Sequence, residues 1–369
     1  MNIQYLEKFY ETDYIPFISE HFMKLNEFVC NKDAQVWSVW KKELQHAFRK
    51  VCTSQEKKQM QEVAYIQIVL LRTRILEQDN RLAIYAYGKQ WYAGEEYHIG
   101  DLDISAFLKQ FEDVYEHLQK KARKYFGKVK RLDIKRLLLE EVTNLLPYLQ
   151  YVFRSFREEI CELDGYQEMQ KGDLFQMQIG EFYELGAAIL QVAKRKNEKL
   201  LRKRIRKDEI LSGYDLSALN LDGCQFRGKD ISDVNLSFCS VRNGSFKGCD
   251  GTGLYLSEAK IIHSLFQHVI LQESVWKRCD LRDNVFDSCV MYHGYKDADS
   301  RYPDSRAMRM EGCDLRGTRF VRCVMNGVDF TQTNLDGCSF ESCALENCRF
   351  GRKQLVNISL EKEDGIIFV

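Results

Sequence analysis

Apolar residues recur at every fifth position through the C-terminal part of the chain. The pattern runs from Leu211 to Met291, where Gly251 is the only centre that is not apolar, and it resumes from Met310 to Leu360. A five-residue period fits neither one face of an α-helix nor the alternation of a β-strand. It predicts a stacked repeat in which each unit buries its apolar residue against neighbouring units.

Large aromatic residues within this pattern predict how the repeats stack. Phe226, Phe246, Phe266 and Phe286 are each 20 residues apart. If one coil holds four five-residue repeats, these rings lie above one another on one wall, where stacking adds to apolar burial. Beyond the interruption the same spacing predicts two ladders on opposite walls, Phe320 with Phe340 and Phe330 with Phe350.

The residues around each centre resemble the pentapeptide-repeat family. Residues 218–223, 279–283 and 313–317 read Ala-Leu-Asn-Leu-Asp-Gly, Cys-Asp-Leu-Arg-Asp and Cys-Asp-Leu-Arg-Gly. They are similar to the family's sequence of a small residue, Asp or Asn, Leu or Phe, and two variable positions. The resemblance implies a right-handed quadrilateral β-helix of about seven coils in residues 208–360. Some family members look like duplex DNA and protect DNA gyrase or topoisomerase IV from quinolones or toxins.

The cysteines follow the same pattern. Ten of the 13 lie two residues before a centre, an inward position that accepts small side chains. Free cysteine behaves there as a small buried apolar residue. A metal site or a disulfide between Cys323 and Cys343 is the alternative, but five-residue spacing matches no zinc motif. We therefore expect these thiols to pack in the core and to hold no metal or cofactor.

A segment at 292–309 interrupts the repeats and is expected to leave the solenoid as a loop. Its composition of tyrosine and arginine is typical of interfaces, and loops on rigid scaffolds often carry function. It is either a partner-binding loop or a tolerated insertion without a role. The candidate partner-binding residues are Tyr292, His293, Tyr295, Asp297, Arg301, Tyr302 and Arg306.

Residues 1–207 lack the five-residue period and are predicted to form an α-helical domain of no recognised family. One apolar stripe runs from Ile134 to Phe156, with Pro147 dividing or kinking the helix. A second helical stripe is read from Phe175 to Ala193. Ahead of both stripes in the chain, residues 84–92 have a strand-like composition that predicts a short hairpin.

The helical half ends in a basic run that has two interpretations. It is a contact for nucleic acid or an acidic partner, or a solvated helix end whose cations complement the helix dipole before the solenoid begins. The second is favoured because no aromatic residues are interleaved. The candidate patch consists of Lys194, Arg195, Lys196, Arg202, Arg204 and Arg206.

Composition describes an ordinary globular protein, and no catalytic motif is present. Lys and Arg balance Asp and Glu at 54 each, so direct nucleic-acid binding is not expected. No secretory signal or bilayer-length apolar run occurs, which predicts a cytoplasmic, bacterial protein without a membrane partner. Glu95-Glu96-Tyr97-His98 beside Trp91 is the nearest approach to an acid–base cluster, and a polar loop is its plainer interpretation.

Three functions remain open from the sequence. The first is a non-enzymatic adaptor that binds a protein through the rigid solenoid and its loop. The second, implied by the resemblance, is topoisomerase protection, although this solenoid has only a small negative net charge. The third is a catalytic domain in residues 1–207 that the solenoid targets.

The apolar tail at 361–369 adds a prediction about the end of the solenoid. It either caps the open edge of the last coil or makes a two-fold dimer, as some family members do. The candidate dimer contact is Ile366, Ile367 and Phe368.

Overall fold

The chain folds into two compact units, each described here by itself. The first comprises Met1–Ile189 with Tyr295–Asp304, and the second comprises Leu190–Gly294 with Ser305–Val369. The computed structural model describes residues 2–31, 33–77, 79–184, 186–292, 294, 301, 303, 306–361 and 366–368. Among the described helices, none combines the length and the apolar character that crossing a bilayer requires.

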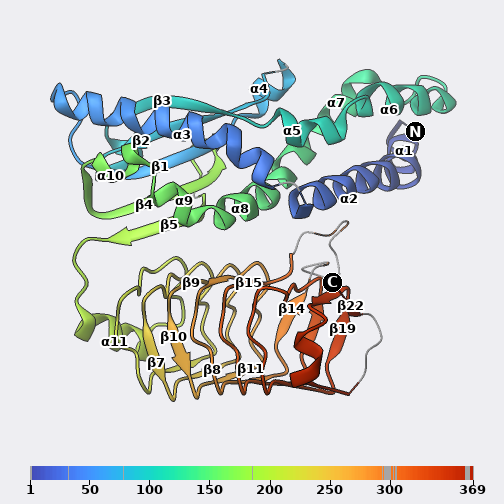
Figure 1. The fold of residues 1–369 in the computed structure, drawn as a ribbon. Helices are drawn as coiled ribbons and strands as arrows, with labels where there is room; N and C mark the ends of the chain where they lie inside the picture. Colours follow the sequence, from blue (N-terminus) through green and yellow to red (C-terminus); the bar gives the residue numbers. More distant parts are fainter. Residues whose placement is uncertain are drawn as a thin grey trace. The chain divides into compact units, whose positions relative to one another are not determined.

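The first unit contains ten α-helices and several single turns among its described residues (Figure 1). The α-helices are α1 (Asn2–Phe9), α2 (Ile15–Asn31), α3 (Asp33–Glu56), α4 (Arg72–Leu76), α5 (Ser105–Leu108), α6 (Val114–Ala122), α7 (Arg131–Glu141), α8 (Leu146–Ser155), α9 (Arg157–Cys161) and α10 (Asp164–Glu168). The turns are η1 (Tyr10–Tyr14), η2 (Trp91–Ala93), η3 (Lys109–Phe111), η4 (Arg123–Tyr125) and η5 (Val142–Leu145).

A five-stranded sheet organises this unit. Its strands lie in the order β3 (Glu96–Asp103), β2 (Arg81–Tyr87), β1 (Val63–Leu70), β4 (Lys171–Glu181) and β5 (Ala187–Ala193). β1 pairs antiparallel with β2 and parallel with β4, and β2 pairs antiparallel with β3. Helix α3 packs on the sheet, and Ala47 of that helix lies against Gly100 of β3.

Aromatic packing holds α3 against helices α5 and α8. The buried ring of Trp40 stacks on Phe107 and Phe153 with centroid separations of 5.6 and 4.3 Å. Its indole N–H donates to the carbonyl oxygen of Asp103 at 2.8 Å, so the indole keeps its hydrogen bond while its rings are buried.

The prediction of an α-helical domain for residues 1–207 is right that helices are present, but it lacks the five-stranded sheet and is wrong about one stripe. The stripe from Phe175 to Ala193 was read as a helix, but these residues form β4 and β5. Their apolar residues are spaced by three or four positions, which imitates a helix face. The predicted helix is interrupted just before Pro147, since α7 ends at Glu141 and α8 begins at Leu146. Strands β2 and β3 form the predicted hairpin.

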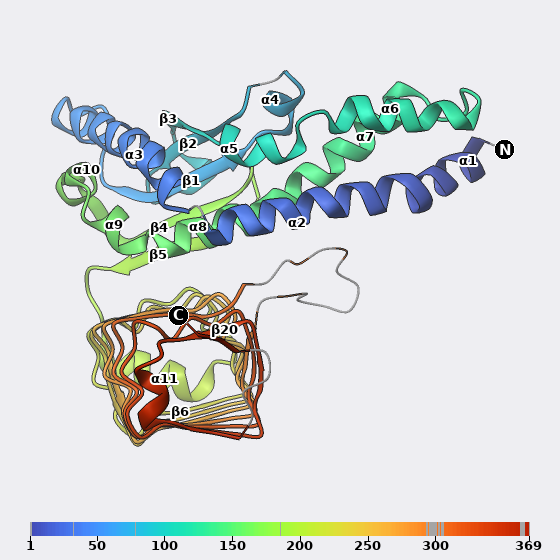
Figure 2. The same cartoon turned by 45° about the vertical axis from the view of Figure 1, so that its right-hand side comes forward.

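The second unit is a stack of coils built from short parallel strands (Figures 1 and 2). It opens with helix α11 (Glu198–Lys207), and a 3₁₀ turn η6 (Gln354–Asn357) lies near its end. The strands are β6 (Gln225–Arg227), β7 (Ser240–Arg242), β8 (Ser245–Lys247), β9 (Tyr255–Ser257), β10 (Lys260–Ile262), β11 (Leu265–Gln267), β12 (Val275–Lys277), β13 (Val285–Asp287), β14 (Val290–Tyr292), β15 (Arg309–Glu311), β16 (Arg319–Val321), β17 (Val324–Asn326), β18 (Ser339–Glu341), β19 (Ala344–Glu346), β20 (Cys348–Phe350), β21 (Ser359–Leu360) and β22 (Ile366–Phe368).

One ladder of phenylalanines runs through the interior of these coils. Its six rings stack at centroid separations of 4.5–5.0 Å and interplanar angles of 4–13°. The members are Phe226, Phe246, Phe266, Phe286, Phe320 and Phe340. Phe286 pairs with Phe320, so the ladder continues across the interruption. Phe330 and Phe350 form a second stack at 5.0 Å, as expected from their spacing.

The turns between strands repeat a left-handed backbone conformation. Two residues after most centres the chain has a positive φ, as at Gly223 (70°) and His263 (51°). Gly, Asn and Asp adopt this region at the lowest cost, which explains why they are common at this position. Larger residues such as Phe238 (φ 59°) also occupy it, because the parallel hydrogen bonds on both sides fix the backbone.

Both ends of the stack are closed by segments of the chain. At one end Ile205 of α11 is buried in the same apolar core as Leu211 and Leu216. At the other end the side-chain amide of Gln354 donates to the carbonyl oxygens of Phe330 and Thr333 at 2.8 and 2.7 Å. These contacts satisfy coil groups that would otherwise be left without a neighbouring coil.

The cysteines of this unit are free thiols, most of them buried. Their S–H groups donate to backbone carbonyls, for example from Cys239 to Leu216 at 2.9 Å and from Cys338 to Leu315 at 3.0 Å. Burial raises the pKa of Cys239 to about 11 and that of Cys338 to about 12. Among the described residues, no group of His, Cys, Asp or Glu is arranged to hold a metal ion.

Replacing one ring of the ladder should be costly, whereas replacing an exposed ring should not. We expect Phe266→Ala to lower the free energy of unfolding by about 3–5 kcal/mol, because rings stack on both of its faces. Phe238→Ala is the matched control, since that side chain is 58% exposed, and should change stability by less than about 0.5 kcal/mol. Urea unfolding followed by circular dichroism measures the stability of both variants. An equal loss of stability in the two would show that ring stacking does not stabilise the coils.

Stability should fall at alkaline pH because the buried thiols hold their protons. An unfolded cysteine titrates near pH 8.5, roughly, but burial raises the folded pKa of Cys239, Cys338 and Cys348 to about 11, 12 and 11. Below the unfolded pKa both states are protonated and stability is unaffected. Above it unfolding releases protons, so stability declines by up to about 1.4 kcal/mol per thiol per pH unit.

Urea unfolding at pH values on either side of the unfolded thiol pKa measures this decline. The control is the triple variant Cys239→Ala, Cys338→Ala, Cys348→Ala, which should have a shallower slope than the natural chain. Equal slopes would show that other groups cause the alkaline loss.

Candidate functional site

One face of the sheet in the first unit is rich in tyrosine and amide side chains. Strand pairing aligns His98, Tyr85, Gln67 and Gln178 in one row across four strands. The adjacent row contains Glu96, Tyr87, Tyr65 and Gln176. We call these eight residues the polar sheet face. Most sheet faces that are covered by protein are apolar, so this arrangement stands out as a candidate site.

Four aromatic residues from two loops cover the polar sheet face, and we call them the aromatic roof. Trp91 and Tyr92 come from the β2–β3 connection, and Phe182 and Tyr183 from the β4–β5 connection. The two loops start from opposite ends of the sheet and meet where the rings of Tyr92 and Tyr183 contact edge to face at 4.7 Å.

The roof also packs down onto the face. The ring of Trp91 lies 4.4 Å from that of Tyr65, and Phe182 lies 5.6 Å from Tyr85. The Tyr92 hydroxyl donates to the side-chain oxygen of Gln67. Roof and face therefore form one aromatic cluster with a polar floor.

Two glycines allow the β4–β5 turn to fold back over the face. A Cβ placed on Gly180 would lie 2.7 Å from the Cα of Gly186, and one on Gly186 would lie 2.6 Å from the carbonyl oxygen of Ile179. Real Cβ atoms do not approach backbone atoms so closely. Glycine at both positions is what lets the chain bring Phe182 and Tyr183 above Gln178.

The neighbouring glutamines Gln67 and Gln178 differ in the hydrogen bonds that their side-chain amides make. Both are fully buried. The amide of Gln67 donates to the carbonyl oxygens of Glu181 and Glu184 at 3.3 and 3.1 Å and accepts from Tyr92. Gln178 has no hydrogen-bond partner for either its amide nitrogen or its oxygen among the described residues. The buried indole N–H of Trp91 likewise has none there.

Ion pairs at the edge of the cluster neutralise some of its charges but not all. Arg72 holds Glu181 with two hydrogen bonds of 2.6 and 2.7 Å, and Arg74 holds Asp101 at 2.5 Å. The carboxylates of Glu95, Glu96 and Glu184 have no cation within ion-pair distance among the described residues. Lys89, in the loop before Trp91, is the opposing charge nearby in the sequence.

Two tyrosines of the face, Tyr85 and Tyr87, remain protonated. Burial, and then the carboxylate of Glu96, which accepts a hydrogen bond from the Tyr87 hydroxyl at 3.0 Å, raise the pKa of Tyr87 far above its ordinary value. Burial also raises the pKa of Tyr85. Tyr85 and Tyr87 therefore present neutral rings to the cluster.

The sequence singled out part of this cluster. Glu96 and His98 lie on β3 at the edge of the face, where His98 bonds Asp101 at 3.1 Å and Glu96 accepts from Tyr87, whereas Trp91 contacts Tyr65 and Tyr92. The residues Gln67, Gln178, Phe182 and Tyr183 were missed, because only strand pairing brings them together. Aromatic residues next to glycines in both loops are the signal that could have pointed to them.

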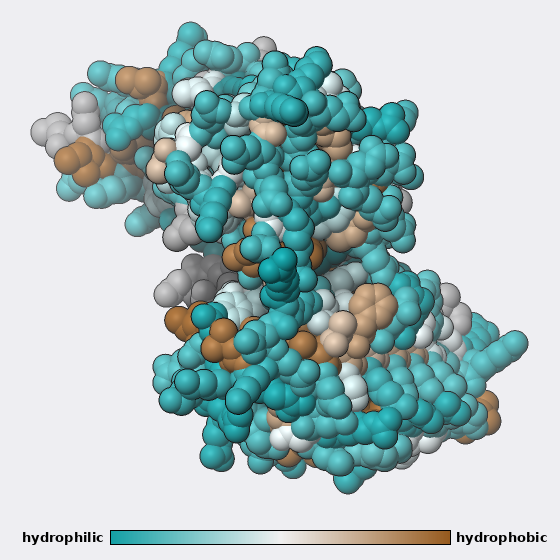
Figure 3. Space-filling model, turned by 90° about the vertical axis from the view of Figure 1, so that its left-hand side faces the viewer, coloured by the Kyte–Doolittle hydropathy of each residue, from teal (hydrophilic) through white to brown (hydrophobic). Residues whose placement is uncertain are grey.

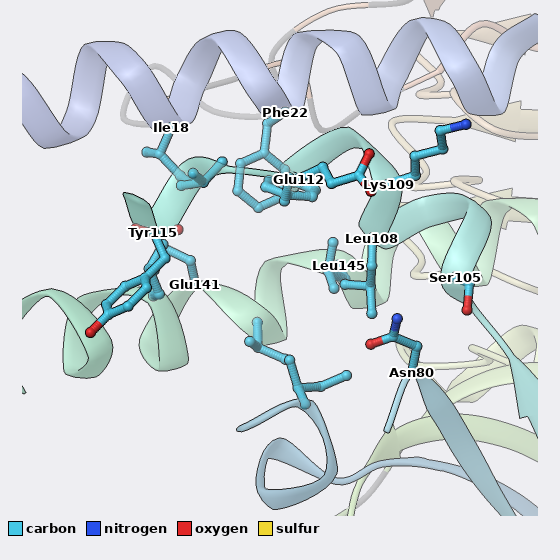
Figure 4. Close-up of a pocket in the computed structure, with 15 residues that line it drawn as sticks. Ile18, Phe22, Asn80, Ser105, Leu108, Lys109, Glu112, Tyr115, Glu141 and Leu145 are labelled. Atoms are coloured by element: carbon cyan, nitrogen blue, oxygen red, sulfur yellow. The ribbon is translucent and has the colours of Figure 1, made fainter. Parts of the chain in front are cut away.

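A second candidate in this unit is a cavity of about 880 Å³. Figure 4 shows Ile18 and Phe22 of α2 on one side and Leu108, Leu145 and Asn80 on the other. Its lining is mainly apolar. Glu141 lies on the wall with only 7% exposure, where its carboxylate accepts from Asn144 at 2.6 Å and pairs with Arg301 at 3.3 Å.

Three of the seven candidate loop residues are described. Arg301 pairs with Glu141 and lies 5.2 Å above the ring of Tyr10, both contacts within the first unit. Arg306 is fully buried and lies 3.8 Å from Glu273 in the second unit. Tyr292 ends strand β14. His293, Tyr295, Asp297 and Tyr302 lie outside the described residues.

Most of the basic candidates make contacts at the end of the solenoid. Lys196 pairs with the buried carboxylate of Asp215 at 2.8 Å, and Arg204 donates to the Tyr214 hydroxyl at 2.9 Å. Arg202 bonds Glu198 at 2.9 Å, and Arg206 donates to the backbone of Arg202. Lys194 and Arg195 are exposed. This end faces the viewer in Figure 3 and is mostly hydrophilic.

The C-terminal candidates form strand β22, which pairs in parallel with β20. Ile366 packs against the core, and Ile367 is 41% exposed. Of the two alternatives for the tail, capping of the last coil agrees with this pairing. A dimer contact through Ile366, Ile367 and Phe368 stays a prediction.

Residues 310–352 match the family described as pentapeptide repeats, in eight copies. Solved structures similar to this chain are also pentapeptide repeat proteins. HetL, involved in heterocyst differentiation regulation in the cyanobacterium Nostoc, is 13% identical, covers 47% of this chain and 92% of its own, and gives a TM-score of 0.25. Rfr23 from the cyanobacterium Cyanothece is 13% identical, covers 41% and 100%, and gives 0.18.

A third similar structure is full-length QnrB1, a plasmid-mediated fluoroquinolone resistance protein. It is 14% identical, covers 43% of this chain and 91% of its own, and gives a TM-score of 0.17. No curated protein matches the sequence significantly. The family match confirms the pentapeptide repeats that the sequence predicts, over residues 310–352.

A single methyl group at Gly186 should disturb the roof of the aromatic cluster. We expect Gly186→Ala to cost about 1–3 kcal/mol and to weaken the near-ultraviolet circular dichroism of the tyrosines, because its Cβ meets the Ile179 carbonyl oxygen at 2.6 Å. Gly88→Ala is the matched control, since its nearest contact, the Glu62 carbonyl oxygen, is 4.0 Å away. Urea unfolding and circular dichroism of both variants check this, and an unchanged Gly186→Ala spectrum would contradict it.

Proposed function

We propose that this chain, which carries pentapeptide repeats, is a non-enzymatic adaptor whose solenoid binds a protein partner. The repeat period of 20 residues supports a four-sided β-helix of about seven coils, and the match to pentapeptide repeats implies that it is right-handed. Figure 2 looks nearly along its axis. Such a scaffold holds outward side chains in fixed rows. A rigid surface of this kind suits recognition better than it suits chemistry that requires closure around a substrate.

The observation that carries the proposal is the ordered charge pattern on the outer face of the coils. Arg282 bonds Asp280 at 2.8 Å and reaches toward Asp314 of the next coil at 3.7 Å. Asp314 in turn bonds Arg316 at 2.8 Å. Hydrogen bonds from Arg282 and Arg316 lower the pKa of Asp280 and Asp314. The row is therefore a fixed array of alternating charges at neutral pH.

This pairing disfavours the topoisomerase-protection alternative. A protein that imitates DNA needs a wall of uncompensated negative charge. Here Glu341 bonds Arg319 at 3.0 Å and Asp287 pairs with Arg322, so carboxylates that would imitate phosphates are matched by arginines. We retain gyrase or topoisomerase IV only as one outcome of the test below.

If the adaptor binds its partner through this row of charges, exchanging the charges should weaken the binding. The double variant Asp314→Arg, Arg316→Asp exchanges two charges of the row and preserves their ion pair, so we expect the fold to remain and capture of the partner from host lysate to fall at least about tenfold. A second bait with residues 292–306 replaced by a Gly-Ser link asks whether the loop takes part.

The outcomes separate the three functions. Capture that is specific to the natural chain and lost in the exchanged variant supports the adaptor. Enrichment of a topoisomerase subunit, with protection from ciprofloxacin in a supercoiling assay, would support the alternative. If the charge-exchanged variant still captures the partner, recognition through this row of charges is refuted. Metabolite turnover by the full chain would favour a catalytic first unit.

A further inference from the structure

One segment of the insertion in the solenoid belongs to the first unit. The first unit includes Tyr295–Asp304, although the residues on either side of this segment belong to the second unit. Two described residues of the segment, Arg301 and Pro303, contact side chains of the first unit. The first unit therefore binds a short piece of the chain that comes from a distant part of the sequence.

Arg301 makes two of these contacts with one group. Its guanidinium lies 3.3 Å from the carboxylate of Glu141 and 5.2 Å from the centre of the Tyr10 ring. A planar guanidinium pairs with a carboxylate and stacks on an aromatic ring in the same position, whereas an ammonium group has no flat face to stack. The arrangement therefore favours arginine over lysine.

Pro303 makes the third contact. The hydroxyl of the fully buried Tyr148 donates to the carbonyl oxygen of Pro303 at 2.6 Å. Proline has a fixed φ, which lowers the conformational entropy that the segment loses when it binds. An arginine followed two positions later by a proline is thus the feature that the first unit contacts.

The first unit builds the site from three separate elements, and we call its three residues the docking site. Tyr10 begins η1, Glu141 ends α7, and Tyr148 lies in α8. The η1 turn is π-helical, a rare conformation that is often found at functional sites. The buried carboxylate of Asp13 in this turn accepts from Lys124 at 2.6 Å, so contacts other than those of the segment hold the turn.

The occupied docking site is open to exchange. The side chain of Arg301 is 43% exposed, and Glu141 also lines the cavity of about 880 Å³ (Figure 4). A partly exposed ion pair contributes modestly to binding. Attachment to the same chain raises the effective concentration of the segment, so a weak site stays filled, and a competitor of the same chemistry can still displace the segment.

We propose that the docking site is a peptide-binding site for an arginine followed two positions later by a proline, and that residues 295–304 occupy it within the same chain. While it is bound, this part of the insertion is not free to contact another protein. A partner segment with the same two residues binds by displacing it. This deepens the proposed adaptor role, on which it rests only for the existence of such a partner.

The test supplies the segment as a separate peptide. The probe is a fluorescein-labelled peptide of residues 295–304, and its binding is followed by fluorescence anisotropy. The receptor is the full chain with residues 295–304 replaced by a Gly-Ser link of equal length, which leaves Arg306 in place. We expect saturable binding to this receptor and at least about tenfold weaker binding to the natural chain, whose site is already occupied.

Variants of the peptide and of the receptor locate the contact. The Arg301→Ala peptide should bind the receptor at least about tenfold more weakly, and the Arg301→Lys peptide should bind with intermediate affinity. Glu141→Gln in the receptor should weaken the natural peptide at least about fivefold. Glu140→Gln is the matched control, since Glu140 is an exposed residue of the same helix, and it should leave binding unchanged.

A point variant of the natural chain tests the same occupancy without replacing the segment. Arg301→Ala in the full chain weakens the hold on its own segment. The labelled natural peptide should therefore bind this variant at least about fivefold more tightly than it binds the natural chain.

Three results would overturn the proposal. If neither the receptor nor the Arg301→Ala chain binds the peptide in a saturable manner, the site does not exist. Equal binding to the natural chain and the receptor would show that residues 295–304 do not occupy the site. Binding that survives Glu141→Gln, or loss of the arginine from the peptide, would place the contact elsewhere. These readouts do not involve the row of charges on the solenoid, so they stand or fall separately from the capture experiment.

Discussion

Stacking of identical positions on successive coils is the constraint on which the second unit depends. Each pentapeptide buries one apolar residue, and that residue finds its partners only in the coil before and the coil after. The phenylalanine ladder shows how strict this is, since Phe286 pairs with Phe320 across an insertion instead of with a nearer residue. An insertion is accepted because it leaves the register of the interior unchanged.

The same constraint explains the outer surface. Coils lie about 4.8 Å apart, so outward side chains at equivalent positions come within reach of an ion pair, as with Arg278 and Glu258 at 3.5 Å. Pairs of this kind contribute little stability when exposed. Their consequence is specificity: interior residues fix the fold, and exterior residues are left to set the charge pattern that a partner meets.

Sequence reasoning succeeded where structure repeats locally and failed where it depends on distant pairing. Phe226 and Phe246 predict their own contact because the period is visible in the chain. Phe175 and Ile179 mislead, since their spacing of four suits a helix, although Met177 between them, flanked by Gln176 and Gln178, keeps the alternation of a strand. Trp91 and Tyr183 meet through Tyr92 only because strands β1, β2 and β4 pair.

Both units contain buried polar groups, and the two differ in how many of these groups the repeat geometry can satisfy. In the solenoid the Asn284 amide, for example, donates to the carbonyl oxygens of Ile261 and Leu281 at 2.7 Å, whereas Ser245, Gln272 and Trp276 each keep a buried atom without a partner among the described residues. In the aromatic cluster, Gln178 is buried beside strained roof residues without a partner among the described residues. Marginal stability leaves little room for such costs. The coils limit them because each coil brings backbone carbonyls within reach of buried polar side chains of the next, as with the Thr318 hydroxyl and the Leu281 carbonyl oxygen at 2.8 Å.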